Sequence, residues 1–201
     1  MYHKACLLGI VVLLTGSGWK AQAQVTQQDS LALVALYNAT DGPNWAVNTN
    51  WLAGPVSTWF GVTVNGDRVS TVSLERNQLS RSLPTDLGDL TDLDILNLSF
   101  NELTGGIPSA LGNLTGLTSL DLSDTPLAGG IPPELGNLIN LTFLDLSFNR
   151  LTGGIPPELG NLTHLDILDL SFNRLTGGIP PELGNLTDLT QLNLFLNQLT
   201  G

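Results

Sequence analysis

Residues Leu138 to Asn161 read LINLTFLDLSFNRLTGGIPPELGN, and residues Leu162 to Asn185 read LTHLDILDLSFNRLTGGIPPELGN. The same 24-residue pattern therefore occurs twice in succession. Two more gapless copies, one divergent copy and one partial copy complete the array: Leu90–Asn113, Leu114–Asn137, 66–89 and 186–201. Gapless copies at a fixed period predict a stack of repeats, in which each unit buries its apolar face against its neighbours.

Each copy carries the pattern LxxLxLxxNxLxGxIPxxLGN. In the copy that begins at Leu138, Leu144 and Leu146 alternate with Asp145, which is the period of a β-strand. We therefore expect both leucines to point into the core and Asp145 to point outward, on a parallel sheet built from successive copies. A second apolar column follows the turn of each copy, at Ile107, Ile131, Ile155 and Ile179.

An asparagine column marks the place where the chain leaves each predicted strand. Its amides can satisfy backbone groups that no regular ladder reaches. Thr125 replaces the asparagine in the third unit, so we expect a local weak point there. The column consists of Asn77, Asn101, Asn149, Asn173 and Asn197.

These motifs resemble the plant-type leucine-rich repeat over residues 66–201. The resemblance implies an α/β solenoid, a curved right-handed superhelix with a parallel β-sheet on its concave side and an extra short strand near each Gly-Ile-Pro segment. It also implies a protein that binds partners and has no catalytic machinery in its repeats.

Residues 24–65 are predicted to form an N-terminal cap over the exposed end of the stack. A helix capped by Asp29 or Ser30 is expected to run to about Ala39, and Asn65-Gly66 predicts a hairpin into the first repeat. Three tryptophans are expected either to plug the solenoid end or to form a carbohydrate platform: Trp45, Trp51 and Trp59.

The cap also resembles a known pattern of plant-type repeat proteins, CxWxGVxC. Ser57 and Val64 stand at its two cysteine positions, and Trp59 stands at its tryptophan. The full stretch is more similar to the caps of exported bacterial and algal repeat proteins, so the tryptophans are expected to replace the missing disulfide.

Residues 1–23 have the order of a secretory signal peptide: His3 and Lys4, a short apolar run, then an AxA-like site that ends at Ala23. We expect cleavage there and a secreted or cell-surface protein. The run is too short to span a bilayer. Cys6, the only cysteine, lies inside this segment, so the mature chain is expected to form no disulfide.

Charge and composition exclude several functions. Beyond the signal peptide, five arginines and no lysine face eighteen acidic residues, which argues against nucleic acid and anionic membranes as partners and leaves a cationic partner or a divalent cation possible. His164 is the only histidine of the mature chain, so we expect no multi-histidine metal site, no cofactor and no catalysis.

Outward strand positions form columns on the predicted concave face, and we expect the ligand there. An acidic column lies beside an aromatic one, and a serine column from Ser99 to Ser171 is expected to point outward between them. The candidate binding residues are Asp94, Asn97, Phe100, Asp121, Phe143, Asp145, Phe148, Asp166, Asp169, Phe172 and Asn193.

The favoured hypothesis is a non-catalytic, secreted or surface-displayed recognition module for a protein, peptide or glycan. A second hypothesis is the N-terminal ectodomain portion of a longer receptor or adhesin, because the array stops in mid-repeat at Gly201. A third is an inhibitor of a wall-degrading enzyme, which rests on the resemblance of fold alone.

Overall fold

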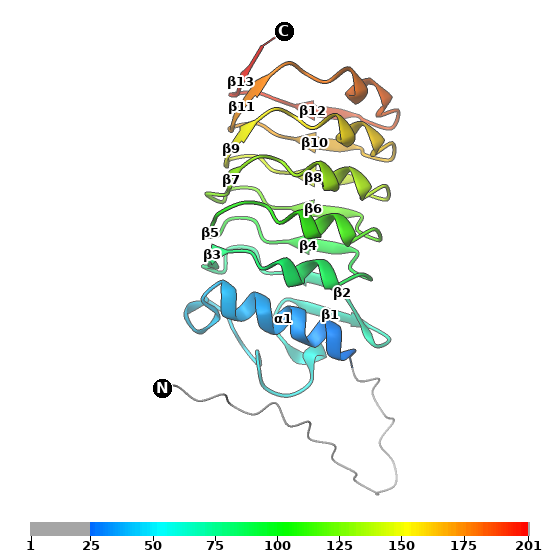
Figure 1. The fold of residues 1–201 in the computed structure, drawn as a ribbon. Coiled ribbons are helices and arrows are strands. Elements are labelled where there is room, and N and C mark those ends of the chain that lie inside the picture. The colour runs from blue at the N-terminus through cyan, green and yellow to red at the C-terminus, as the bar shows by residue number, and fades with distance from the viewer. Residues whose placement is uncertain (1–24, 201) are drawn as a thin grey trace, which may run out of the picture.

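The computed structural model describes residues 25–200, so the predicted signal peptide lies outside the described residues. Figure 1 shows a stack of coils with one long helix at its N-terminal end. Each coil brings one strand to a common sheet and one short helical turn to the opposite side. This is the solenoid that the repeats predict.

The main sheet has seven strands in the order β1-β2-β4-β6-β8-β10-β12. β1 and β2 are antiparallel, and every later pair is parallel. Residues 24 positions apart lie opposite one another, as Asp121 and Asp145 do. The strands are β1 (Val62–Asn65), β2 (Arg68–Ser73), β4 (Ile95–Asn97), β6 (Ser119–Asp121), β8 (Phe143–Asp145), β10 (Ile167–Asp169) and β12 (Gln191–Asn193).

Short strands follow the asparagine column and confirm the extra strand that the resemblance implied. They pair with a register of 22 residues instead of 24, so that Thr152 lies beside Arg174 and Thr176 beside Gln198. These strands are β3 (Ser80–Ser82), β5 (Glu102–Thr104), β7 (Ala128–Gly129), β9 (Arg150–Gly153), β11 (Arg174–Gly177) and β13 (Gln198–Leu199).

A 3₁₀ turn closes each coil on the side away from the main sheet. Prolines stand before it or at its first position, where their missing N–H costs nothing. Gly136 lets successive turns approach, because an added Cβ would lie 2.4 Å from the Glu158 carbonyl oxygen. The turns are η3 (Thr85–Asp89), η4 (Ser109–Asn113), η5 (Pro133–Asn137), η6 (Pro157–Asn161) and η7 (Pro181–Asn185).

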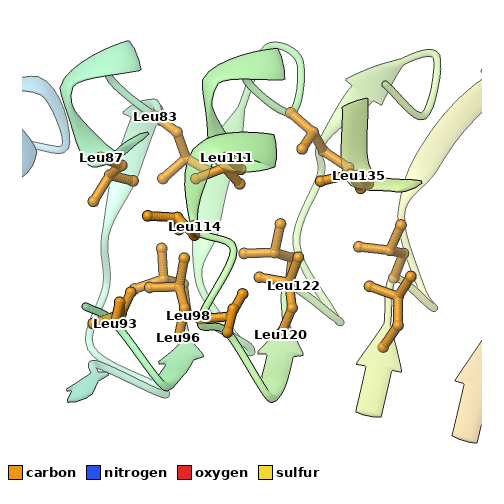
Figure 2. Close-up of a cluster of buried hydrophobic side chains, with 14 of the residues drawn as sticks. Leu83, Leu87, Leu93, Leu96, Leu98, Leu111, Leu114, Leu120, Leu122 and Leu135 are labelled. Atoms are coloured by element: carbon orange, nitrogen blue, oxygen red, sulfur yellow. The ribbon is translucent and has the colours of Figure 1, made fainter. Parts of the chain in front are cut away.

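Leucines from every coil fill the space between the main sheet and the 3₁₀ turns. Figure 2 shows Leu96, on β4, and Leu98, which follows the strand, pointing toward Leu111 and Leu114. All four are fully buried, as are Leu144 and Leu146. The alternation that predicted inward leucines is therefore confirmed, and one continuous core runs along the stack.

The asparagine column joins each coil to the one before it. The Asn173 side-chain amide donates to the Leu146 carbonyl (2.8 Å), and its Oδ1 accepts from the Leu151 N–H (2.9 Å). Thr125 contacts the Asn149 Oδ1 through its hydroxyl (2.8 Å). Within residues 25–200 it makes neither of the bonds that an asparagine would make one coil back, to the Leu98 carbonyl and the Leu103 N–H.

The cap begins with α1 (Gln27–Ala39), which starts earlier than the sequence predicted. Thr26, not Asp29 or Ser30, caps it by accepting from the Asp29 N–H (3.2 Å). Asp29 is instead fully buried, where its carboxylate accepts from the Val69 N–H (2.7 Å) and pairs with Arg68 (3.1 Å). This ion pair, in which only the carboxylate is fully buried, fastens the helix to the first strand of the repeats.

The remainder of the cap, with η1 (Gly42–Asn44) and η2 (Val56–Thr58), surrounds an aromatic cluster. The Trp51 ring lies 4.8 Å from the Trp45 ring and 4.9 Å from the Trp59 ring, and it stacks on Tyr37 at 5.8 Å. All three tryptophans are buried, and each indole N–H donates to a backbone carbonyl. The structure thus supports the plug over the carbohydrate platform.

The predicted hairpin is present, although its turn is shifted by one residue. Asn65 pairs with Arg68, so Gly66 and Asp67 form the tip, and Gly66 has the positive φ that the turn requires. Among residues 25–200, no helix combines the length and the apolar character needed to cross a bilayer.

Candidate ligand-binding face

The outward side of the main sheet, called the sheet face below, brings the acidic column together. Asp121, Asp145 and Asp169 lie directly opposite one another on β6, β8 and β10. Asn97 and Asn193 continue this column at its two ends. The structure therefore places five of the predicted binding residues in one line across the strands.

Hydrogen bonds already occupy the Oδ1 atom of each of these carboxylates. The Ser147 N–H donates to the Asp145 Oδ1 (2.8 Å), and the Ser171 N–H and hydroxyl both donate to the Asp169 Oδ1. Asn97 accepts in the same way from Ser99. The shared geometry means that this column shapes the turn after each strand, whether the residue is charged or neutral.

Burial raises the pKa of the Asp145 carboxyl above its ordinary value. Hydrogen bonds from Ser147 oppose the shift, while the neighbouring carboxylates Asp121 and Asp169 add to it. Asp145 is the middle member of the column and has an acidic neighbour on each side. Its ionised form is therefore less favourable in the folded protein than in the unfolded chain.

The serine column does not point outward, and that expectation was wrong. Ser99, Ser123, Ser147 and Ser171 are all buried. The main strands end at the acidic column, so the two-residue alternation stops there. The next leucine and the serine after it both turn inward.

The phenylalanines after these serines form an exposed row at the end of the strands. Phe100, Phe148 and Phe172 have left-handed backbones (φ 52–54°), which turn their side chains away from the core. They are 42%, 51% and 36% exposed. The rings of Phe148 and Phe172 stack at 4.0 Å and 11°, and Phe195 meets Phe172 edge-on at 5.8 Å.

Asp124 takes the place of a phenylalanine in the third unit and interrupts this row. A pocket of about 290 Å³, called the acidic pocket below, lies on the N-terminal side of this break in the row. Sequence reasoning did not include its charged residues, although the departure of the third unit from the SFN pattern could have drawn attention to them. The lining residues are Arg76, Gln78, Phe100, Asn101, Glu102 and Asp124.

The remaining predicted residues lie nearer the start of the strands. Asp94 accepts from the Thr118 hydroxyl (2.5 Å), and Asp166 accepts from the Thr190 hydroxyl. Phe143 lies half-buried between Ser119 and Ile167 on the neighbouring strands. These three residues lie on the sheet face beside the acidic column, at the opposite end of the strands from the phenylalanine row.

His164 lies beside an aspartate, 3.3 Å from Asp188, where both side chains are exposed. Among residues 25–200, no three His, Cys, Asp or Glu side chains are grouped so that they could hold a metal ion.

The fold and the repeat geometry define a leucine-rich repeat solenoid. The family profiles described as Leucine Rich Repeat and as Leucine Rich repeats (2 copies) match residues 92–114, 116–138 and 139–177. The chain belongs to the leucine-rich repeat family and is of the plant type. No curated protein sequence matches the chain.

Three solved plant structures show the likeness. A plant ice-binding protein is 34% identical over 89% of this chain, with a TM-score of 0.81, and this chain spans 58% of it. A chain of the BIR3–SERK2 complex from Arabidopsis thaliana is 33% identical, with 86% of this chain and 95% of that one covered and a TM-score of 0.73. The BIR2 ectodomain from Arabidopsis thaliana is 32% identical, with 89% of this chain and 96% of that one covered and a TM-score of 0.75.

Proposed function

We propose that this chain is a non-catalytic recognition module, secreted or displayed at the cell surface, that binds a protein or peptide on its sheet face. The likeness to the BIR2 ectodomain and to the BIR3–SERK2 complex supports both the extracellular location and the binding of a macromolecule. The predicted signal peptide over residues 1–23 agrees with export.

The observation that carries the proposal is the exposed phenylalanine row beside the acidic column. Large apolar side chains of a soluble protein are normally covered, and a contiguous exposed group of them marks an interaction surface. Phe148 and Phe172 also hold each other in place by stacking. A partner would therefore meet an ordered apolar surface and would lose little side-chain freedom on binding.

A random-peptide display selection tests this proposal. The wild-type chain and a Phe148→Ser/Phe172→Ser variant are immobilised side by side, together with a Glu134→Gln/Glu158→Gln control that alters exposed residues of the 3₁₀ turns. The proposal predicts that wild type and control enrich the same peptides and that the serine variant does not retain them. Equal enrichment on all three proteins would contradict it.

A second candidate function is adsorption to ice, favoured by the likeness to the plant ice-binding protein. Exposed threonines recur on the short strands at Thr104, Thr152 and Thr176, and Thr200 directly follows the last of these strands. The 22-residue register sets Arg174 beside Thr152 and Gln198 beside Thr176, which breaks up the threonine row, so we place recognition first.

Thermal hysteresis and ice-recrystallisation assays test the second candidate. Activity that Thr152→Lys/Thr176→Lys removes and Phe148→Ser/Phe172→Ser leaves intact would establish it. Inactive wild-type protein would exclude it.

A further inference from the structure

The acidic pocket and the stacked pair Phe148–Phe172 follow one another along the edge of the sheet face. We propose that together they bind an extended peptide segment in which a lysine or arginine lies two positions away from an aromatic or large aliphatic residue. The inference rests on the proposed function, and it names the class of partner that this face takes.

The acidic pocket has unmatched negative charge. Glu102 and Asp124 are exposed, and within residues 25–200 neither forms an ion pair. Arg76 lies 3.1 Å from Glu75, and its guanidinium lies 4.2 Å above the Phe100 ring, so its charge is already matched. A basic side chain in the pocket would place its charged head against the Asp124 carboxylate, and the Glu102 carboxylate would add to the negative charge around it.

The stacked pair supplies the apolar subsite. Phe148 and Phe172 are nearly parallel and are both exposed, so their ring edges form one apolar patch. An aromatic or aliphatic side chain would bury this patch from water, and aromatic contacts add to what area burial alone provides. Phe195 extends the patch by one more repeat.

The spacing of the two subsites fixes the spacing of the motif. Neighbouring strands lie about 4.8 Å apart, and the middle of the stacked pair is one and a half repeats beyond Asp124, or about 7 Å. Two residues of an extended peptide span about 6.6 Å and present their side chains on the same side. A basic residue and an apolar residue two positions apart therefore reach both subsites at once.

Neighbouring charges restrict the basic residue to the pocket. Asp121 and Asp145 lie along the strands beside the row, which favours a cationic segment overall. Arg150 and Arg174 begin the short strands just after the stacked pair and are exposed. They would repel a basic residue bound beside the phenylalanines and offset the attraction of Asp145 and Asp169 for it, so the charge pattern favours the pocket for the basic residue.

Fluorescence anisotropy on the full chain tests the inference with a labelled synthetic peptide in each order, Gly-Ser-Lys-Ser-Phe-Ser-Phe-Ser-Gly and Gly-Ser-Phe-Ser-Phe-Ser-Lys-Ser-Gly. The one that binds more tightly is called the lysine peptide below. Two matched peptides carry glutamate or norleucine in place of the lysine. We expect the lysine peptide to bind about tenfold more tightly than the norleucine peptide, because a charge-assisted contact is gained, and the glutamate peptide to bind most weakly.

Two double variants separate the subsites. Glu102→Gln/Asp124→Asn should abolish the preference for lysine while leaving the norleucine peptide unchanged. Phe148→Ala/Phe172→Ala should weaken all three peptides by about tenfold or more. Glu134→Gln/Glu158→Gln should change nothing, and thermal unfolding of each variant shows that it is folded.

Equal binding of the lysine and glutamate peptides, or a lysine preference that survives Glu102→Gln/Asp124→Asn, would overturn the inference. If the lysine peptide does not bind while library-selected peptides still depend on Phe148 and Phe172, the inference is wrong and the proposed function stands. If no peptide depends on these phenylalanines, both are wrong.

Discussion

The Asp145 side chain stabilises the turn after its strand through a hydrogen bond, but its charge destabilises the folded protein. Its Oδ1 accepts from the Ser147 N–H, which orders the chain after the strand. Its charge lies half-buried between two other carboxylates. Asn97 holds the same place in the second unit and accepts the same hydrogen bond from Ser99 without a charge. The hydrogen bond, not the charge, is thus what the fold needs at this position.

Replacing Asp145→Asn should raise the unfolding temperature at pH 7. Because the pKa of Asp145 is raised in the folded protein, the unfolded chain loses this proton at lower pH, and the folded state is penalised as the pH rises from the unfolded pKa through the folded one. The stabilisation should therefore vanish at a pH below both pKa values. Thermal scans from pH 2.5 to 8 measure this, with exposed Asp89→Asn as the control. A gain that is independent of pH would contradict the account.

Replacing Asp29→Asn should destabilise the protein by about 2 kcal/mol or more, because the charge of Arg68 loses its buried partner while the bond from the Val69 N–H survives. Asp41→Asn is the matched control, since its partner Arg81 is 63% exposed, and it should cost less than about 1 kcal/mol. Urea unfolding compares the two variants. Equal losses would show that the buried pair does not fasten the cap.

Single residues mark the limit of prediction from the sequence. The helix over 27–39 is recognisable from its sequence. Asp29 was predicted to cap it because its actual partner, Arg68, lies 39 residues away in the chain and leaves no local signal. The serine column looked outward because alternation was extended past Leu146, where the backbone in fact bends through the left-handed Phe148. Both errors come from contacts and dihedral angles that no local pattern records.

The structural unit of this protein is the 24-residue repeat, and the contacts between neighbouring repeats determine its stability. The asparagine column and the glycines of the 3₁₀ turns act between coils, not within them. The sequence predicted these elements well, because a fixed period shows which positions must be alike. It left Thr125 as a predicted weak point, and that prediction still needs its measurement.

Replacing Thr125→Asn should stabilise the protein by about 1 to 2 kcal/mol, because two hydrogen bonds to the preceding coil would form, to the Leu98 carbonyl and from the Leu103 N–H. The reciprocal change, Asn173→Thr, removes the same pair of bonds and should destabilise the protein. Urea unfolding measures both. A loss of stability in Thr125→Asn would show that the third unit has adapted around its threonine.

Replacing Gly136→Ala should destabilise the protein by about 1 to 3 kcal/mol, because the new methyl group would lie 2.4 Å from the Glu158 carbonyl oxygen and would force two coils apart. Gly184→Ala is a matched control in the same PELGN context, with no atom within 4 Å of the new Cβ. Its stability should stay close to wild type. Equal effects would mean that close approach is not why glycine occupies this column.

At the scale of the whole molecule, the stack presents a long sheet face with an excess of acid. The sequence predicted the acidic column and the phenylalanines, because both recur with the repeat. It did not predict the acidic pocket, which lies beside the break in the row and is lined by Asp124 and by Phe100 and Glu102 from the unit before it. In this array, a position that departs from the repeat pattern, Asp124, is the one that distinguishes the proposed binding site from the regular repeats.

Binding of the lysine peptide should weaken as sodium chloride rises from 50 to 500 mM, since salt screens exposed charges. Binding of the norleucine peptide should change little over the same range, because it depends on apolar contact. Anisotropy titrations measure both. Parallel losses for the two peptides would show that the preference for lysine is not electrostatic.

The most direct test of the sheet face as the recognition surface is hydrogen–deuterium exchange of the chain with and without a peptide that it selects. The account predicts new protection in β8 and β10 and in the turns after them, from Phe143 to Asn149 and from Ile167 to Asn173, with the 3₁₀ turns unchanged. Protection confined to the turns Pro133–Asn137 and Pro157–Asn161, with the sheet face unchanged, would contradict it.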